Sequence, residues 1–438
     1  MNIRFLSILL VMVLGAGASC AVAESTAVEL PPGVQIPRAA QPGPGFDVEK
    51  ATQAYLALLS SAQRAKSDAY FEGGYWVSLW QALYTTATCI LLISLGWATG
   101  IRRWVTARMS RRWLQSALTV ALLWLVLSLF GMPMDWYTGF FREHQYNMSN
   151  QTFGGWLHDW IIAVAVNLVL VTIMVTAVYI FVRRAKEYWV LRATAFTFVA
   201  LLILFMVSPV FIAPLFNDYK PLPPGETRDA ILSLARANNI PTTNVMWFDQ
   251  SRQTKRISAN VSGLFGTTRV SLNDNLLNKT SLPEIKAVMG HEMGHYVLNH
   301  SFKGTMQFTL LFGAMFLILN WLFEGPLRSY RARHGIADRA DPAGFPLAFA
   351  ALTILGLLGS PLLNRVTYVA EAEADMFGLN AAREPHGFAT SAIRLGAYRK
   401  LEPGPIEEFL LYDHPSGYER VHRSMLWLEE NQDTAAVR

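Results

Sequence analysis

Residues 281–323 are SLPEIKAVMGHEMGHYVLNHSFKGTMQFTLLFGAMFLILNWLF. The first part carries charges and two histidines four residues apart, whereas 304–323 contain no Asp, Glu, Lys or Arg. An apolar run of about 20 residues is long enough to cross a bilayer as a helix. The stretch therefore predicts a polar helix followed closely by a membrane-spanning helix.

The same uncharged pattern occurs five more times, at 75–101, 113–134, 160–182, 193–217 and 342–364. Charged residues make up 16% of the chain, against about 25% in a soluble domain, and hydrophobic residues make up 52%. Helices of this length in soluble proteins normally carry charges on one face, so six buried helices of a large soluble protein are a poor alternative. Two cysteines also exclude a disulfide scaffold. The sequence predicts a mainly α, polytopic membrane bundle with six spans.

The N-terminal segment 1–23 has the pattern of a secretory signal, with Arg4 before an apolar run and a small-residue cleavage site at Ala21-Val22-Ala23. Left uncleaved, it would form a seventh span. Pro209, Pro214 and Pro361 predict kinks or early helix ends. The expected divisions are a linker with an amphipathic helix (24–73), a four-span bundle (74–217), a catalytic segment (218–303), a transmembrane hairpin (304–364) and a second catalytic segment (365–438).

Basic residues in short loops predict the orientation. Loops 102–112, 183–192 and 324–341 each carry four or five Lys and Arg residues, whereas loop 135–159 carries only Arg142. Cytoplasmic loops accumulate such residues, so both catalytic segments are expected outside the cytoplasm. We therefore expect a bacterial inner-membrane protein with a periplasmic site. The formal charge of +5 is explained by this arrangement, so the expected partner is the lipid bilayer and not nucleic acid.

The polar helix contains an HExxH motif, His291-Glu292-Met293-Gly294-His295. Histidines at i and i+4 lie about 40° apart around a helix, so both can bind one zinc ion. Ser281-Leu282-Pro283-Glu284 predicts the helix start through a capping box. Glu292 is the candidate general base for a zinc-activated water. The alternative, two ordinary surface histidines, is less favoured because the helix is so clearly delimited.

A catalytic zinc site needs a third protein ligand. Leu298 and Ser301 occupy the places where a metzincin has its Gly and third His, which excludes that class. Glu371 and Asp375 are spaced i, i+4 and share a helix face, whereas Glu373 points about 200° away. We therefore predict Glu371 as ligand and Asp375 as hydrogen-bond partner of a ligand imidazole. A charged surface helix is the alternative interpretation of this segment.

The lengths of the intervening segments favour the pairing. His295 precedes one apolar run and Glu371 follows the next, so both are expected roughly 10–14 Å beyond the same membrane face. His300 is predicted on the opposite helix face, as an interfacial histidine. The remaining histidines have no ligand spacing and are interpreted as structural or solvated: His144, His158, His334, His386 and His422.

From about Phe46 onward the chain resembles the CAAX prenyl protease 1 family of integral-membrane zinc metalloproteases. The resemblance depends on the HExxH helix, on the stretch from Phe211 to Asn217 (FIAPLFN), on Glu371-x-x-Ala374-Asp375 and on His414-Pro415. It implies that one zinc per chain is bound by His291, His295 and Glu371, and that the spans enclose a large chamber.

The resemblance also implies roles that the residues alone do not predict. His414 and Arg420 would lie near the substrate carbonyl, where a donor steadies an oxyanion. Residues 256–272 predict two short strands joined through Gly263 and Gly266. In the family, the segment matching Ser258-Ala259-Asn260 pairs with extended peptide, although a purely structural hairpin is equally compatible with the sequence. The chain departs from the family at Thr367 and Tyr368, where a Ser-Arg pair is common.

The expected function is zinc-dependent hydrolysis of peptide bonds in a peptide or protein substrate. Two other functions remain open: a non-proteolytic assembly or transport protein with a structural zinc site, and a quality-control protease of the heat-shock type. Quality control of exported proteins and cleavage of a specific lipidated peptide are both compatible with the residues. The sequence does not predict the substrate or the oligomeric state.

Overall fold

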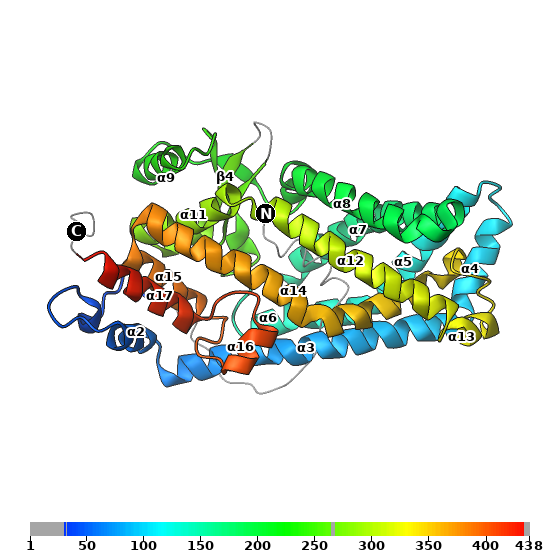
Figure 1. Cartoon of the computed structure of the whole chain (residues 1–438), viewed down its shortest axis with the longest axis horizontal. Coiled ribbons are helices and arrows are strands. Elements are labelled where there is room, and N and C mark those ends of the chain that lie inside the picture. The colour runs from blue at the N-terminus through cyan, green and yellow to red at the C-terminus, as the bar shows by residue number, and fades with distance from the viewer. Residues whose placement is uncertain (1–29, 32, 264–267, 433–438) are drawn as a thin grey trace.

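The structure, a computed structural model, describes residues 30–31, 33–263 and 268–432. The molecule is elongated, with its longest helices along the long axis and a small sheet with several shorter helices at one end (Figure 1). The predicted signal segment 1–23 lies outside the described residues, as does Gly266 of the predicted hairpin turn.

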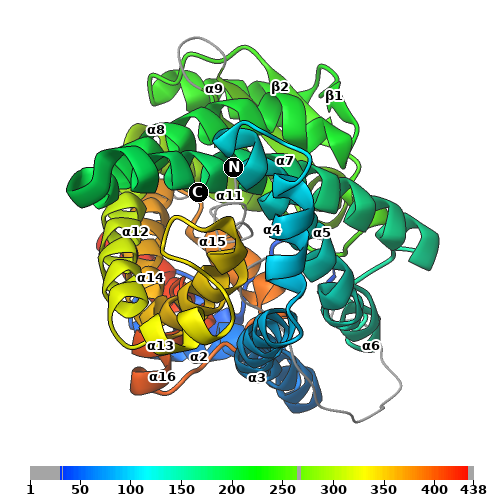
Figure 2. The ribbon, with the colours of Figure 1, turned by 90° about the vertical axis from the view of Figure 1, so that its right-hand side faces the viewer.

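Six helices in the described part of the chain are long and apolar enough to cross a membrane, which confirms the predicted number of spans. They are α3 (Ser61–Ser94), α5 (Arg112–Trp136), α7 (Phe153–Ala185), α8 (Trp189–Val207), α12 (His300–Glu324) and α14 (Phe345–Ala382). In that order each helix contacts the next, and α14 contacts α3, so the six form a closed ring (Figure 2).

The ring has apolar side chains on its outer surface and a cavity inside. Ile173, Leu310 and Leu358 are each more than half exposed, as expected for side chains that face lipid. A cavity of about 360 Å³ lies among α5, α7, α8, α12 and α14. The interior space that the family resemblance implies is therefore present between the helices.

The basic loops lie together at the end of the molecule opposite the sheet. This end holds α4 (Trp97–Thr106) and α13 (Arg328–Arg333), at the right in Figure 1. Arg102 pairs with the buried carboxylate of Asp341. Arg183 donates hydrogen bonds to Ser116 Oγ at 2.9 Å and to the Ala340 carbonyl at 3.4 Å. These contacts join the three predicted cytoplasmic loops directly.

The sheet has four strands in the order β1-β2-β4-β3. The strands are β1 (Tyr219–Pro221), β2 (Val245–Phe248), β3 (Ala259–Ser262) and β4 (Arg269–Asn273). The predicted hairpin is the antiparallel β3–β4 pair, with Asn260 opposite Ser271. It belongs to a larger sheet because β4 also pairs in parallel with β2.

Shorter helices complete the end of the molecule that carries the sheet. They are α2 (Val48–Leu56), α9 (Glu226–Ala237), α10 (Asp274–Lys279), α11 (Leu282–Val297), α15 (Pro385–Leu395), α16 (Pro405–Leu411) and α17 (Gly417–Glu430). Val270, Met289 and Met293 belong to the buried core between the sheet, α9 and α11. Tyr55 and Ile393 belong to a second core, where α2 packs on α15 and α17.

Two helix boundaries differ from the sequence prediction. Pro361 does not end its helix. It lies inside α14, which runs from Phe345 to Ala382. The predicted amphipathic stretch 48–69 is divided between α2 and the start of α3, where Ser60 and Gln63 form a capping box. Near Pro209 and Pro214 the α-helix ends and is followed by one π and one 3-10 turn, as the prolines predict.

Helices α11 and α14 approach each other through glycines. A Cβ atom on Gly378 would lie 2.7 Å from the His291 backbone nitrogen, and one on Gly290 would lie 3.0 Å from the Gly378 carbonyl oxygen. On Gly294 it would meet Phe377 at 3.1 Å. Real Cβ atoms need more room than this, so the helix spacing depends on hydrogen as the side chain.

We expect Gly378→Ala to destabilise the protein by about 1–3 kcal/mol, because the added methyl group collides with backbone that has no free space to move into. Thermal unfolding of the detergent-purified protein measures the change. Gly359→Ala is the matched control in the same helix, since its Cβ meets nothing within 4 Å. The control should be neutral or stabilising, and equal losses of stability in both variants would contradict the prediction.

Candidate metal site

The HExxH motif lies on α11, whose first turn is fixed by buried charge. Glu284 is fully buried and accepts hydrogen bonds from the Ser281 backbone nitrogen at 2.8 Å and from Ser281 Oγ at 2.7 Å. Its other oxygen pairs with Arg394 of α15 at 2.5 Å. Glu284 therefore closes the capping box predicted from the sequence and also ties α11 to the C-terminal segment.

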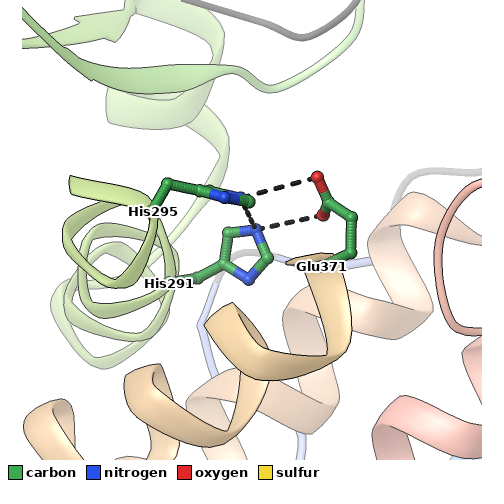
Figure 3. A group of neighbouring side chains, drawn as sticks. All are labelled: His291, His295 and Glu371. Carbon is green, nitrogen blue, oxygen red and sulfur yellow. Dashed lines mark hydrogen bonds and ion pairs between the residues drawn. The ribbon is translucent and has the colours of Figure 1, made fainter. Parts of the chain in front are cut away.

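His291, His295 and Glu371 point at one another across the gap between α11 and α14 (Figure 3). The two Nε2 atoms are 3.1 Å apart, His291 Nε2 is 3.3 Å from Glu371 Oε2, and His295 Nε2 is 3.5 Å from Glu371 Oε1. Two donor atoms held about 2.0–2.2 Å from a tetrahedral zinc ion lie about 3.3–3.6 Å apart. The donor types fit one zinc ion, two of the separations lie in this range, and the Nε2–Nε2 separation is about 0.2 Å shorter.

The predicted partner, Asp375, lies directly behind His291. Its Oδ1 is 2.8 Å from His291 Nδ1, and its side chain is completely buried. The Arg420 Nε atom is 3.0 Å from Asp375 Oδ2, and Arg420 Nη2 is 3.3 Å from Glu371 Oε2. Arg420 thus places one positive charge against both buried carboxylates, which would otherwise be more costly to bury beside each other.

Buried charges at the site shift the pKa values of the α11 side chains. Burial lowers the pKa of His295 to about 3, which leaves this ring neutral and able to bind a metal. Burial also disfavours the charged form of His291, but hydrogen bonds to Asp375 and Glu371 outweigh it and raise its pKa to about 10. The same carboxylates would attract a divalent cation to His291 Nε2.

The residues His291, His295 and Glu371 are called the triad below. Glu292 lines the same cavity as these three residues. Burial raises the pKa of its carboxyl group to about 7, so the group can accept and release a proton near neutral pH. His414 lies on the other side of the ligand carboxylate, with its Nε2 3.2 Å from Glu371 Oε2 and its Nδ1 2.7 Å from Asp413 Oδ1. Burial lowers the pKa of His414.

His300 is not where the sequence analysis expected it. The prediction assumed one continuous helix, but Asn299 adopts a left-handed conformation, with φ of 56°, between α11 and α12. This break turns His300 back toward the site, where its Nδ1 is 2.9 Å from His295 Nδ1. Its Nε2 is 2.9 Å from Oε2 of Glu373, the carboxylate predicted to point away from the ligand face.

The contacts of the remaining histidines are with residues outside the triad. His144 bonds the Phe140 carbonyl, His158 bonds Asp159, His334 bonds the Tyr330 carbonyl, His386 bonds Tyr55 and His422 stacks on Tyr418. They take part in local packing or in surface contacts, in agreement with the sequence interpretation.

A cavity of about 650 Å³ opens onto the site. Its lining includes His291, His295 and Glu371, together with Glu292, His414, Arg420 and Asn260 of β3. It adjoins the smaller cavity within the ring, because Asn167, Leu170, Phe308 and Thr367 line both. A space therefore leads from the edge of the sheet, past the triad, into the ring of membrane helices.

Comparisons with known protein families cover nearly the whole described chain. The model of the CAAX prenyl protease N-terminal region, described as five membrane helices, matches residues 49–218. The model of peptidase family M48 matches residues 221–425. Both parts of the resemblance suggested by the sequence are confirmed.

Curated relatives extend over most of the chain. An uncharacterized metalloprotease, YhfN of Bacillus subtilis, is 32% identical over 76% of this chain and 79% of its own length. A CAAX prenyl protease 1 homolog of Arabidopsis thaliana is 30% identical over 66% of this chain and 68% of its own length.

The fold has a counterpart among solved structures. The crystal structure of Ste24p from S. mikatae superposes with a TM-score of 0.70, covering 86% of this chain and 94% of Ste24p at 21% identity. The sequence relatives, the matched domains and the donor set agree with this fold. This chain therefore belongs to peptidase family M48, as a multi-pass membrane zinc metalloprotease of the CAAX prenyl protease 1 type.

Proposed function

We propose that this protein is an endopeptidase that hydrolyses peptide bonds in the cavity beside His291, His295 and Glu371. The observation that supports this most directly is the combination of three zinc-type donors with a buried carboxyl group, Glu292, on the same cavity wall. A structural zinc site would normally have a fourth protein ligand, and no fourth residue joins the triad within the described residues.

The three donors would hold one zinc per chain. When bound, zinc supplies a Lewis acid that acidifies water and polarises a carbonyl group. Glu292 would take a proton from the attacking water and deliver it to the leaving amine, which suits a carboxyl group with a pKa of about 7. Asp375 would fix the ring of His291 so that Nε2 faces the metal.

His414 and Arg420 are placed to stabilise negative charge. Their Nε2 and Nη2 atoms lie 3.2 and 3.3 Å from the same oxygen of Glu371, so both donors reach the rim of the metal position. A peptide carbonyl oxygen becomes negatively charged there as water attacks. We assign these two residues to oxyanion stabilisation.

Asn260 provides the surface for the substrate backbone. It lies on β3, the last strand in the sheet order, and lines the same cavity as the triad. Edge strands bind extended peptides through main-chain hydrogen bonds. A substrate strand added beside β3 would pass its scissile bond in front of His291 and His295.

The substrate class follows from the cavity. It continues from the triad among apolar residues of the ring, including Leu170 and Phe308, so a peptide with an apolar or lipidated end is a suitable substrate. The named CAAX prenyl proteases among its relatives make a prenylated peptide one candidate. An unfolded exported protein is the other.

Loss of any triad residue should remove the metal. We expect about one zinc per purified wild-type chain and far less in His291→Ala, His295→Ala and Glu371→Ala, because two donors cannot hold zinc tightly. Elemental analysis of the detergent-purified proteins measures this. His422→Ala, which only removes a ring stacked on Tyr418, is the control and should retain zinc. Triad variants with full zinc content would refute the assigned ligands.

Removal of the base should stop hydrolysis without removing the metal. We expect Glu292→Gln to lower kcat by about 10²–10⁴-fold with zinc content unchanged, because the amide cannot accept the proton. The assay uses an unfolded reporter and a farnesylated CAAX peptide in parallel, and the faster reaction identifies the substrate class. Glu430→Gln, an exposed change on α17, is the matched control. Full activity of Glu292→Gln would refute the mechanism, and a zinc-loaded wild type inactive on both substrates would favour a structural metal.

We also propose that the site faces the periplasm of a bacterial inner membrane. The basic loops occupy the end of the molecule opposite the sheet and α11, and such loops remain cytoplasmic.

Labelling of single cysteines in the full chain tests this orientation. In a background with Cys20 and Cys89 replaced, Glu430→Cys should react with a membrane-impermeant maleimide on intact cells, and Ser329→Cys should react only after lysis. Both positions are exposed, one at the C-terminal end of α17 and one in the basic loop 324–341. The reverse pattern would place the site in the cytoplasm.

A further inference from the structure

His300 lies in direct contact with a metal-binding histidine although it is not one of the three donors. Its side chain is 2% exposed and its Nδ1 is 2.9 Å from His295 Nδ1. The contact exists because Asn299 turns the chain between α11 and α12. A polar ring buried at this position needs a hydrogen-bond partner on each nitrogen, and the structure provides both.

The two contacts of His300 leave only one arrangement of protons compatible with zinc binding. His295 must keep the lone pair on Nε2 for the metal, so its proton is on Nδ1 and is donated to His300 Nδ1. His300 then carries its own proton on Nε2 and donates it to Glu373 Oε2, 2.9 Å away. Each ring is neutral, and every donor has an acceptor.

Glu373 is a hydrogen-bond acceptor that is partly exposed to solvent. Its side chain is 48% exposed, and Lys303 Nζ lies 3.8 Å from the same oxygen. It stands between Glu371 and Asp375 on α14, on the face that the sequence analysis placed about 200° from the ligand face. The segment from Glu371 to Asp375 therefore reaches both histidines of α11, directly from Asp375 and through His300 from Glu373.

We propose that His300 and Glu373 are positioning residues that orient His295 and fix its tautomer for zinc binding, as Asp375 does for His291. This inference rests on the proposed function, because it assigns a role toward the same metal. In this proposal His300 and Glu373 do not bind the metal themselves. It predicts that removing the His300 contact weakens zinc binding even though all three donors remain.

Zinc affinity of the full-length, detergent-purified protein tests the inference independently of proteolysis. We expect His300→Phe, which fills the same space without a hydrogen bond, to weaken zinc binding by about 10–100-fold. Competition with a chromogenic chelator measures the dissociation constant. Co²⁺ bound in place of zinc should show an altered visible spectrum, because His295 is free to rotate. His158→Phe, at a largely exposed histidine, is the matched control and should bind zinc like the wild type.

Glu373, the second positioning residue, is tested by a single substitution and by a double variant with His300→Phe. Glu373→Gln should weaken zinc binding in the same direction but less, because water can replace an exposed acceptor. The double variant should bind zinc no more weakly than His300→Phe alone, since Glu373 acts through His300. His300→Gln should recover part of the affinity, because its amide can accept from His295 and donate to Glu373.

The outcomes separate this inference from the proposed function. A wild-type protein that binds no zinc overturns both. A folded His300→Phe protein with wild-type zinc affinity and Co²⁺ spectrum overturns the inference alone, and so does a double variant whose two losses add fully. If His300→Phe does not fold, His300→Gln and Glu373→Gln provide the comparison, and unchanged affinity in both would overturn the inference.

Discussion

The structure depends on one close contact, the approach of α11 to α14 at Gly290, Gly294 and Gly378. Neither helix carries all of the metal donors, so the distance between the two helix axes sets the distance between the histidines and Glu371. With no Cβ atoms between them, the backbones approach closely enough for donor atoms to meet at 3.1–3.5 Å. The ring of membrane helices holds both α11 and α14. Helix α14 is a member of the ring, and α11 is followed directly by α12, which is another member.

Much of this arrangement could be predicted because the responsible patterns are local. Uncharged runs identified all six spans, and the capping box with HExxH identified α11. The i, i+4 spacing of Glu371 and Asp375 predicted that one helix face carries both, and Asp375 does lie against His291. These predictions need only helical periodicity and the thickness of a bilayer.

Other features depend on geometry that no local pattern records. His300 was placed on the wrong face because a single left-handed residue, Asn299, resets the helical phase. The positive φ of an Asn is a known exception to helical continuity, so the Leu298-Asn299 pair was the available signal. The parallel pairing of β2 with β4 joins strands distant in sequence. The position of Arg420 between two carboxylates was not predicted, because the family resemblance implied only that Arg420 lies near the substrate carbonyl.

The placement of the donors on both sides of a membrane hairpin has a consequence for biosynthesis. His291 and His295 leave the ribosome before α12, and Glu371 leaves it only after α12 and most of α14. A nascent chain therefore cannot assemble the donor set until two more helices have entered the bilayer. Arg420 comes later still, on α17, so the carboxylates of α14 gain their counter-charge last. An incompletely inserted chain therefore lacks a complete donor set, because the order of the helices along the chain delays its assembly.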